Sequence, residues 1–120
     1  LRGRVQRLRA LMGTPLSRSV AGVLDSTGRA DLELGPAPTW ESWTFNSLTV
    51  SSDSSSPVTA AVYRGSPGDD SLLDSTPDGR AQTTDTVMTL QPGNRLTIRF
   101  DGGTPGARCS VTADGTRTAL

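Results

Sequence analysis

Histidine and lysine are both absent from this chain of 120 residues, in which all 12 basic residues are arginine. Histidine is the commonest general base near neutral pH and the commonest metal ligand, and lysine is the residue that forms Schiff bases. Without them, the many serines and threonines lack the usual bases that would activate them, which leaves only carboxylates for acid–base chemistry. We therefore expect a protein that is not an enzyme and that carries no cofactor.

Cysteine and aromatic residues are scarce. Cys109 is the only cysteine, which excludes an intrachain disulfide and a cysteine-based zinc site, and its inward position on an expected strand predicts a small buried hydrophobe. The few aromatic residues speak against a glycosidase cleft, which aromatic rings usually wall. Calcium could use carboxylates of one loop, but their spacing fits no EF-hand, so we expect solvated side chains and no metal site. These carboxylates belong to Asp69, Asp70, Asp74 and Asp78.

Long apolar runs are missing as well. No stretch approaches the roughly 18 apolar residues of a membrane span, and residues 1–12 lack the unbroken apolar centre of a signal peptide, so we expect a soluble chain. Only 33% of the residues are hydrophobic, which predicts a thin core in one domain. Oligomerisation or docking on a larger body would help to stabilise such a core.

The first 13 residues have the pattern of a basic amphipathic helix. Four apolar residues recur at spacings of four, three and four, arginines occupy the other faces, and Gly13 with Pro15 ends the helix. Such a helix could bind phosphates, an anionic membrane surface or an acidic protein. We favour docking on a protein or on further copies of the chain, and expect neither nucleic acid nor membrane as partner. The expected contact residues are Leu1, Arg2, Arg4, Val5, Arg7, Leu8, Arg9 and Met12.

From Val20 onward the hydrophobic period changes to two, which predicts strands. Alternation over residues 30–34, 43–50, 58–63, 88–90, 96–100 and 107–113, with turns between them, predicts about seven or eight strands. In the second of these segments the alternation changes phase, which predicts a bulge near Asn46 and Ser47. The fold expected over residues 25–120 is an antiparallel β-sandwich or jelly roll. Residues 14–24 are either a linker or the first strand, and residues 64–85 are expected to form a long turn-rich segment.

Three aromatic residues are candidates for the core or for a contact surface. Trp43 shares its side of the strand with Phe45 and is expected in the core. Trp40 follows a proline-rich crossing and is a candidate for a rim or interface. Tyr63 lies next to the segment 64–85, so Trp40, Tyr63 and that segment are candidate surface contacts.

Residues 23–119 resemble a group of small virion proteins of actinobacterial tailed phages, which are called minor tail, head-fibre or capsid decoration proteins. The resemblance consists of strand and turn patterns and includes no catalytic motif. In chain order they are TGRADLELGP, WTFNSLTVS, TAAVYRG, LLDSTPDG, LQPGNRLTIRFDG and GARCSVTADGT. The basic segment at residues 1–22 lies outside the resemblance.

This resemblance implies a β-sandwich displayed on the surface of a virion as a homo-oligomer, with a trimer favoured. The N-terminal segment would attach it to the major capsid protein or to another virion protein. Because the chain is short, we expect a capsid-surface decoration protein or minor capsid protein. The alternatives are a minor tail protein and a carbohydrate- or cell-surface-binding module that uses Trp40 and Tyr63.

Overall fold

The computed structural model describes residues 13–76 and 78–120, which form strands and one short 3-10 helix. The elements are β1 (Thr14–Val23), β2 (Ala30–Leu34), β3 (Glu41–Ser52), β4 (Thr59–Arg64), η1 (Asp69–Ser71), β5 (Leu72–Thr76), β6 (Ala81–Thr84), β7 (Met88–Leu90), β8 (Leu96–Asp101) and β9 (Arg108–Ala119). The prediction of an all-β fold is confirmed. Apart from Gly13, the helix expected over residues 1–13 lies outside the described residues and stays a prediction.

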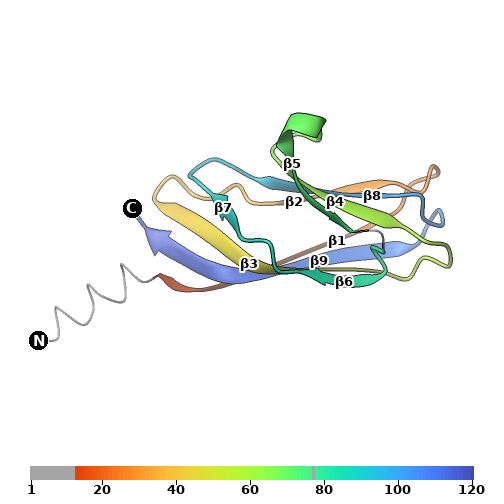
Figure 1. Ribbon diagram of the computed structural model, residues 1–120, viewed down its shortest axis with the longest axis horizontal. Coiled ribbons are helices and arrows are strands. Elements are labelled where there is room, and N and C mark those ends of the chain that lie inside the picture. The colour runs from red at the N-terminus through yellow and green to blue at the C-terminus, as the bar shows by residue number, and fades with distance from the viewer. Residues whose placement is uncertain (1–12, 77) are drawn as a thin grey trace, which may run out of the picture.

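The strands pair as one long antiparallel ribbon that is curled into two layers. Along the ribbon, β1 pairs with β9, β2 with β8, β3 with both β6 and β7, and β4 with β5. The curl adds two further pairs, β9 with β3 and β8 with β4. The result is sheet A, in the order β1-β9-β3-β6 with β7 also on β3, and sheet B, in the order β2-β8-β4-β5. Figure 1 shows these sheets as the lower and the upper layer.

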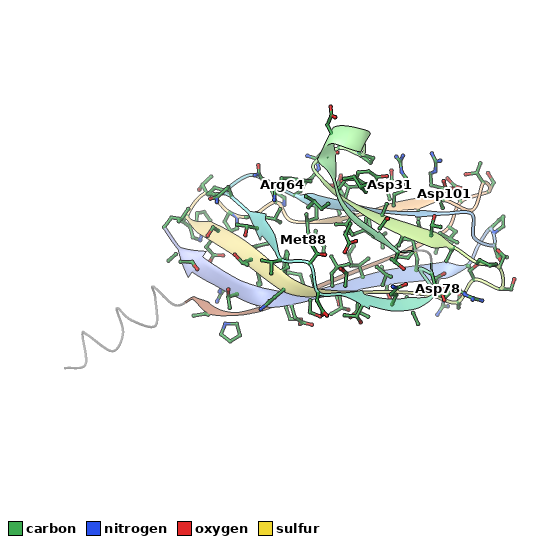
Figure 2. The ribbon with its side chains drawn as sticks, viewed as in Figure 1. Asp31, Arg64, Asp78, Met88 and Asp101 are labelled. Atoms are coloured by element: carbon green, nitrogen blue, oxygen red, sulfur yellow. The ribbon has the colours of Figure 1, made fainter. Side chains whose placement is uncertain are left out.

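Both sheets contribute to a single core, because each strand presents its apolar residues to one side. Phe45 of sheet A and Phe100 of sheet B are fully buried, and Trp43 packs edge-on against Phe45 with ring centroids 6.1 Å apart. In Figure 2, Met88 lies between the two layers. The expectation that Trp43 belongs to the core is confirmed. In the described part of the chain, no helix has the length and apolar content needed to cross a membrane.

The predicted bulge in β3 is present. The register of β3 on β9 shifts between Phe45 and Ser47, and the extra residue, Asn46, is exposed. Trp43 and Phe45 before the shift and Leu48 and Val50 after it are therefore all buried. A β-bulge has this effect because one additional residue changes which face the following side chains occupy.

The structure decides between the alternatives for residues 14–24 and corrects the expectation for residues 64–85. For residues 14–24 a linker and a strand were both open; residues 14–23 of this segment form β1, which pairs with β9 along its whole length. The interpretation of residues 64–85 as one long turn-rich segment was wrong, because they contain η1, β5 and β6 and carry the chain from sheet B to sheet A. Their inward positions include polar residues such as Gln82 and Thr84, opposite Val50 and Leu48, so no apolar alternation indicated these strands. The described residues thus form nine strands, slightly more than expected.

A polar clasp joins the edges of the two sheets at β5 and β6. Asp74 of β5 accepts hydrogen bonds from the hydroxyls of Thr84 and Thr86 and, at 2.8 Å, from the backbone N–H of Ser75; the Thr86 bond is also 2.8 Å. The bond from Thr84, followed by those from Thr86 and Ser75, lowers the pKa of the Asp74 carboxyl, while desolvation opposes the shift. The clasp therefore stabilises the fold most while Asp74 is ionised.

An Asp74→Asn variant should be less stable than the wild type by about 1 kcal/mol at neutral pH, because the amide replaces a charged acceptor at a partly exposed site. A lowered folded-state pKa gives stability that is fully present above the unfolded pKa, about 3.9, and is lost as pH falls through the folded pKa. Urea unfolding of both proteins at neutral pH and near pH 2 to 3 measures the difference, which should narrow in acid. A difference that is the same at both pH values would contradict this role.

Candidate functional site

All eight partner-binding residues predicted from the sequence lie outside the described residues. They are Leu1, Arg2, Arg4, Val5, Arg7, Leu8, Arg9 and Met12. Trp40 and Tyr63 are described, and so is the start of β1, which follows the basic segment in the chain. The surroundings of these residues define the candidate site.

One end of sheet A carries exposed apolar side chains. Trp40, just before β3, is 64% exposed, and Leu120, just after β9, is 72% exposed. The backbone N–H of Leu120 donates a hydrogen bond to the carbonyl oxygen of Trp40 at 2.9 Å. β1 begins at the same end, because Thr14 lies opposite Arg117 of β9 (Figure 1). The basic segment therefore enters β1 at the same end of sheet A as an exposed tryptophan, with β9 between β1 and β3. We call this region, formed by Thr14, Trp40 and Leu120, the attachment end.

Polar contacts fix the three strands of the attachment end to one another. The indole N–H of Trp43 donates to Glu41 Oε2 at 2.9 Å, and the other oxygen of Glu41 lies 3.9 Å from Arg117 Nη1. Arg117 Nε in turn donates to Thr14 Oγ1 at 3.1 Å. The guanidinium of Arg18 lies over the Trp43 ring, 5.0 Å from its centroid, which is a cation–π arrangement. The start of β1 is thus held in place where the basic segment joins it.

Tyr63 belongs to a different surface. It is half-buried on β4 of sheet B and faces outward, because Ala60 and Val62 of the same strand face the core. It lies opposite Leu72 of β5, so Tyr63 and part of segment 64–85 are neighbours. Trp40, in contrast, precedes a strand of sheet A. The structure therefore places Tyr63 on sheet B and Trp40 in the turn that leads into sheet A.

The outer face of sheet A is rich in hydroxyl groups, a feature that sequence reasoning missed. Side chains of neighbouring strands bond to each other across it, with Ser19–Thr112 at 2.8 Å and Thr49–Thr83 at 2.9 Å. Alternate serines and threonines in β1, β3 and β9 were the available signal. A shallow trough of about 650 Å³ opens at the far end of this face. The trough is lined by Ala21, Gly22, Val23, Ser51, Ser52, Asp53, Arg108, Cys109 and Ser110.

The outer face of sheet B is charged instead. Arg99 donates two hydrogen bonds to the carboxylate of Asp31, at 2.8 and 2.9 Å, and this contact is the main cause that lowers the pKa of Asp31. Arg29 pairs with Asp101 at 3.1 Å. Asp31 and Asp101 project from the upper layer in Figure 2. Ion pairs of this kind are typical of a face that meets solvent, whereas the hydroxyl face of sheet A carries few charges.

Asp74 and Asp78 of segment 64–85 bind different partners within the fold. Asp78 accepts hydrogen bonds from Arg80, while Asp74 is held by threonines. Within residues 13–76 and 78–120, no group of three His, Cys, Asp or Glu residues is placed to hold a metal ion. These two carboxylates therefore serve local contacts within the fold.

Cys109 is 2% exposed on the inner side of β9, and burial raises the pKa of its thiol. The expectation of a buried cysteine is confirmed. Because the thiolate is the reactive form, the native protein should react with a thiol reagent at least roughly tenfold more slowly than the urea-unfolded protein. Absorbance after addition of an aromatic disulfide reagent measures both rates, and equal rates would contradict the burial of this side chain.

No family model matches the sequence, and no curated protein matches it either.

Proposed function

We propose that this chain is a non-enzymatic structural protein of a tailed-phage virion, most simply a decoration protein or minor capsid protein on the capsid surface. In this proposal a basic amphipathic helix over residues 1–13 anchors the domain to the major capsid protein or another virion protein. The order of the strands is the observation that carries the proposal, and the attachment end supports it.

The strand order supports a jelly roll as the finer description of the fold. A jelly roll is an eight-stranded antiparallel ribbon, made of two Greek keys, that is rolled into two facing sheets. The pairs β1–β9, β2–β8, β3–β6 and β4–β5 form such a ribbon, with β7 as a short addition on β3. Viral capsid proteins and lectins both use this fold. The choice between them must come from the binding surface.

The attachment end favours docking through the basic segment. Tryptophan is one of the residue types most often found at the energetic centre of a protein interface. Trp40 is exposed and lies at the end of sheet A where β1 begins. Arginines of the segment would meet an acidic groove, and its apolar stripe would be buried there. The rest of the chain has a negative balance, since 12 acidic residues are all located from Asp25 onward. The two parts of the molecule would therefore face different surroundings.

Binding of the chain to particles tests this proposal. Particles of the encoding phage, prepared without the chain, are mixed with the full chain, with a variant lacking residues 1–12, and with Trp40→Ala and Tyr63→Ala. We expect the truncated protein to remain unbound and Trp40→Ala to bind at least roughly tenfold more weakly, as for an interface hot spot. Tyr63→Ala is the matched control, an aromatic on the other sheet, and should bind as the wild type does. Full occupancy by the truncated protein would refute anchoring through the segment.

A carbohydrate- or cell-surface-binding module is the second candidate, because lectins share the jelly roll and the trough on sheet A could accept a polar ligand. Its two proposed aromatic contacts are Trp40, in the turn before β3 of sheet A, and Tyr63, on β4 of sheet B. Their separation speaks against a sugar-binding surface that uses both rings. A glycan array with the full chain separates the candidates. Saturable sugar binding that Tyr63→Ala abolishes would favour the module, and no saturable binding would favour the virion role.

A further inference from the structure

β1 is the longest edge strand of the described fold. It pairs with β9 on one side, and no strand of the described residues pairs with its other side. It runs for 10 residues and follows β9 without a register shift. The other edge strands, β2, β5, β6 and β7, have 5, 5, 4 and 3 residues. Short edges, bulges and edge prolines are common protections against pairing with another chain. β1 lacks the first two, and its one proline, Pro15, removes a donor only near the start of the strand.

The side chains of β1 also leave its edge open. Its only charged residue is Arg18, whose guanidinium lies over the ring of Trp43. The side chains on the outer face are small or apolar, and none is charged; they belong to Pro15, Ser17, Ser19, Ala21 and Val23. Charged side chains that normally discourage strand addition are therefore absent from the outer face of this strand.

The middle of β1 is accessible. A hollow of about 360 Å³ opens beside Arg18, Ser19 and Val20, between β1 and the end of β2 in the other sheet. Ser17, Arg18 and Ser19 are all exposed. The described residues thus provide no element that covers this part of the edge.

We propose that two copies of this chain pair through β1, antiparallel, about a two-fold axis that passes through Ser19. Residues that lie directly opposite each other in a pair of strands have side chains on the same face of the sheet. In a two-fold pair this holds only when the axis passes through a residue and not between two residues. An axis at Arg18 would set two guanidinium groups opposite each other. An axis at Ser19 instead sets Arg18 opposite the second copy's Val20 and uses residues 15–23 of both copies.

The register centred on Ser19 also sets a large side chain opposite a glycine and two apolar side chains opposite each other. Leu16 lies opposite the second copy's Gly22, and Val23, which is 60% exposed, lies opposite the second copy's Pro15. A row of hydroxyls, from Thr83 through Thr49 and Thr112 to Ser19, continues into the second copy. The outer face of sheet A becomes one continuous hydroxyl-rich surface in the pair.

This pairing goes beyond the proposed virion role and is independent of it. It is a two-fold pair, whereas the resemblance favoured a trimer. An edge of this length spans about 30 Å and makes an interface smaller than the roughly 800 Å² per partner of stable complexes. The pair is therefore weak and forms as the protein concentration rises.

Light scattering across a concentration series tests the pair with the full chain. The average mass of the wild type should rise from 12.6 kDa toward twice that value. Ser19→Arg should remain at 12.6 kDa, because it opposes like charges at the axis. Thr49→Arg is the matched control, since it lies in the same hydroxyl row on the same face and also loses one exposed hydroxyl bond. It should behave as the wild type does.

Mixing of oppositely charged variants tests the position of the axis. Ser19→Arg and Ser19→Asp should each be monomeric alone, and their equimolar mixture should regain the doubled mass, because only an axis at residue 19 brings the two side chains together. Circular dichroism confirms that all variants are folded. A wild type that stays monomeric at every concentration, or a loss of the pair in Thr49→Arg but not in Ser19→Arg, would overturn the proposal, as would a mixture that remains monomeric.

Discussion

A Gly115→Ala variant should lose most of its folded population. A Cβ atom at this position of β9 would lie 1.8 Å from the carbonyl oxygen of Thr44 and 2.8 Å from the Cα of Phe45. Both contacts are with the main chain of β3 next to its bulge, so no side chain can move away to make room. We expect a loss of roughly 3 to 5 kcal/mol in the free energy of unfolding, which is most of the stability of a small domain. Urea unfolding followed by circular dichroism measures it.

Gly68→Ala is the matched control for this substitution. Gly68 has an extended backbone with φ 174°, and the nearest atom to an added Cβ is Ser71 Oγ at 3.8 Å. Its stability should change by less than about 0.5 kcal/mol. If Gly115→Ala unfolds at the same urea concentration as Gly68→Ala, the result would contradict the close contact between Gly115 of β9 and the main chain of β3.

Phe45→Ala should cost roughly 3 to 5 kcal/mol, whereas Trp40→Ala should change stability by no more than about 0.5 kcal/mol. Phe45 is fully buried between the sheets, and its removal leaves a cavity that the packed core cannot close. Trp40 is larger but 64% exposed, so its removal deletes little buried surface. Chemical unfolding of both variants under the same conditions gives the two values.

The contrast between these two aromatics separates folding from binding. If Trp40→Ala is as stable as the wild type and still attaches poorly to particles, the indole acts in the contact itself. Equal losses of stability in Phe45→Ala and Trp40→Ala would show that Trp40 is part of the core. Trp40 could then not be the exposed contact residue of the attachment end.

The sequence predicted the strands whose inward residues are apolar. Leu96, Ile98 and Phe100 alternate with polar residues and form β8 as expected, and the change of phase around Asn46 located the bulge. β5 and β6 were not predicted, because short edge strands bury little and can place polar residues such as Gln82 on the inner side.

The partners of each strand could not be predicted from local patterns. Alternation indicates which face of a strand is buried, but it is the same for any neighbour that the strand pairs with. The exposed positions of Trp40 and Leu120 at one end of sheet A likewise depend on the pairing of β3 with β9, whose residues are far apart in the chain. The hydroxyl face was visible as alternate serines and threonines, but its role as a surface required the sheet order.

Mass spectrometry of purified particles tests the central claim most directly. Under the proposed virion role, particles of a phage whose genome carries this sequence are separated from free protein by density-gradient centrifugation. Peptides of the chain are then quantified against those of the major capsid protein. The account predicts a fixed ratio of the two proteins across independent preparations, as expected for a component that occupies symmetric sites. Peptides found only in the unsedimented fraction, with none in the particles, would contradict a virion role.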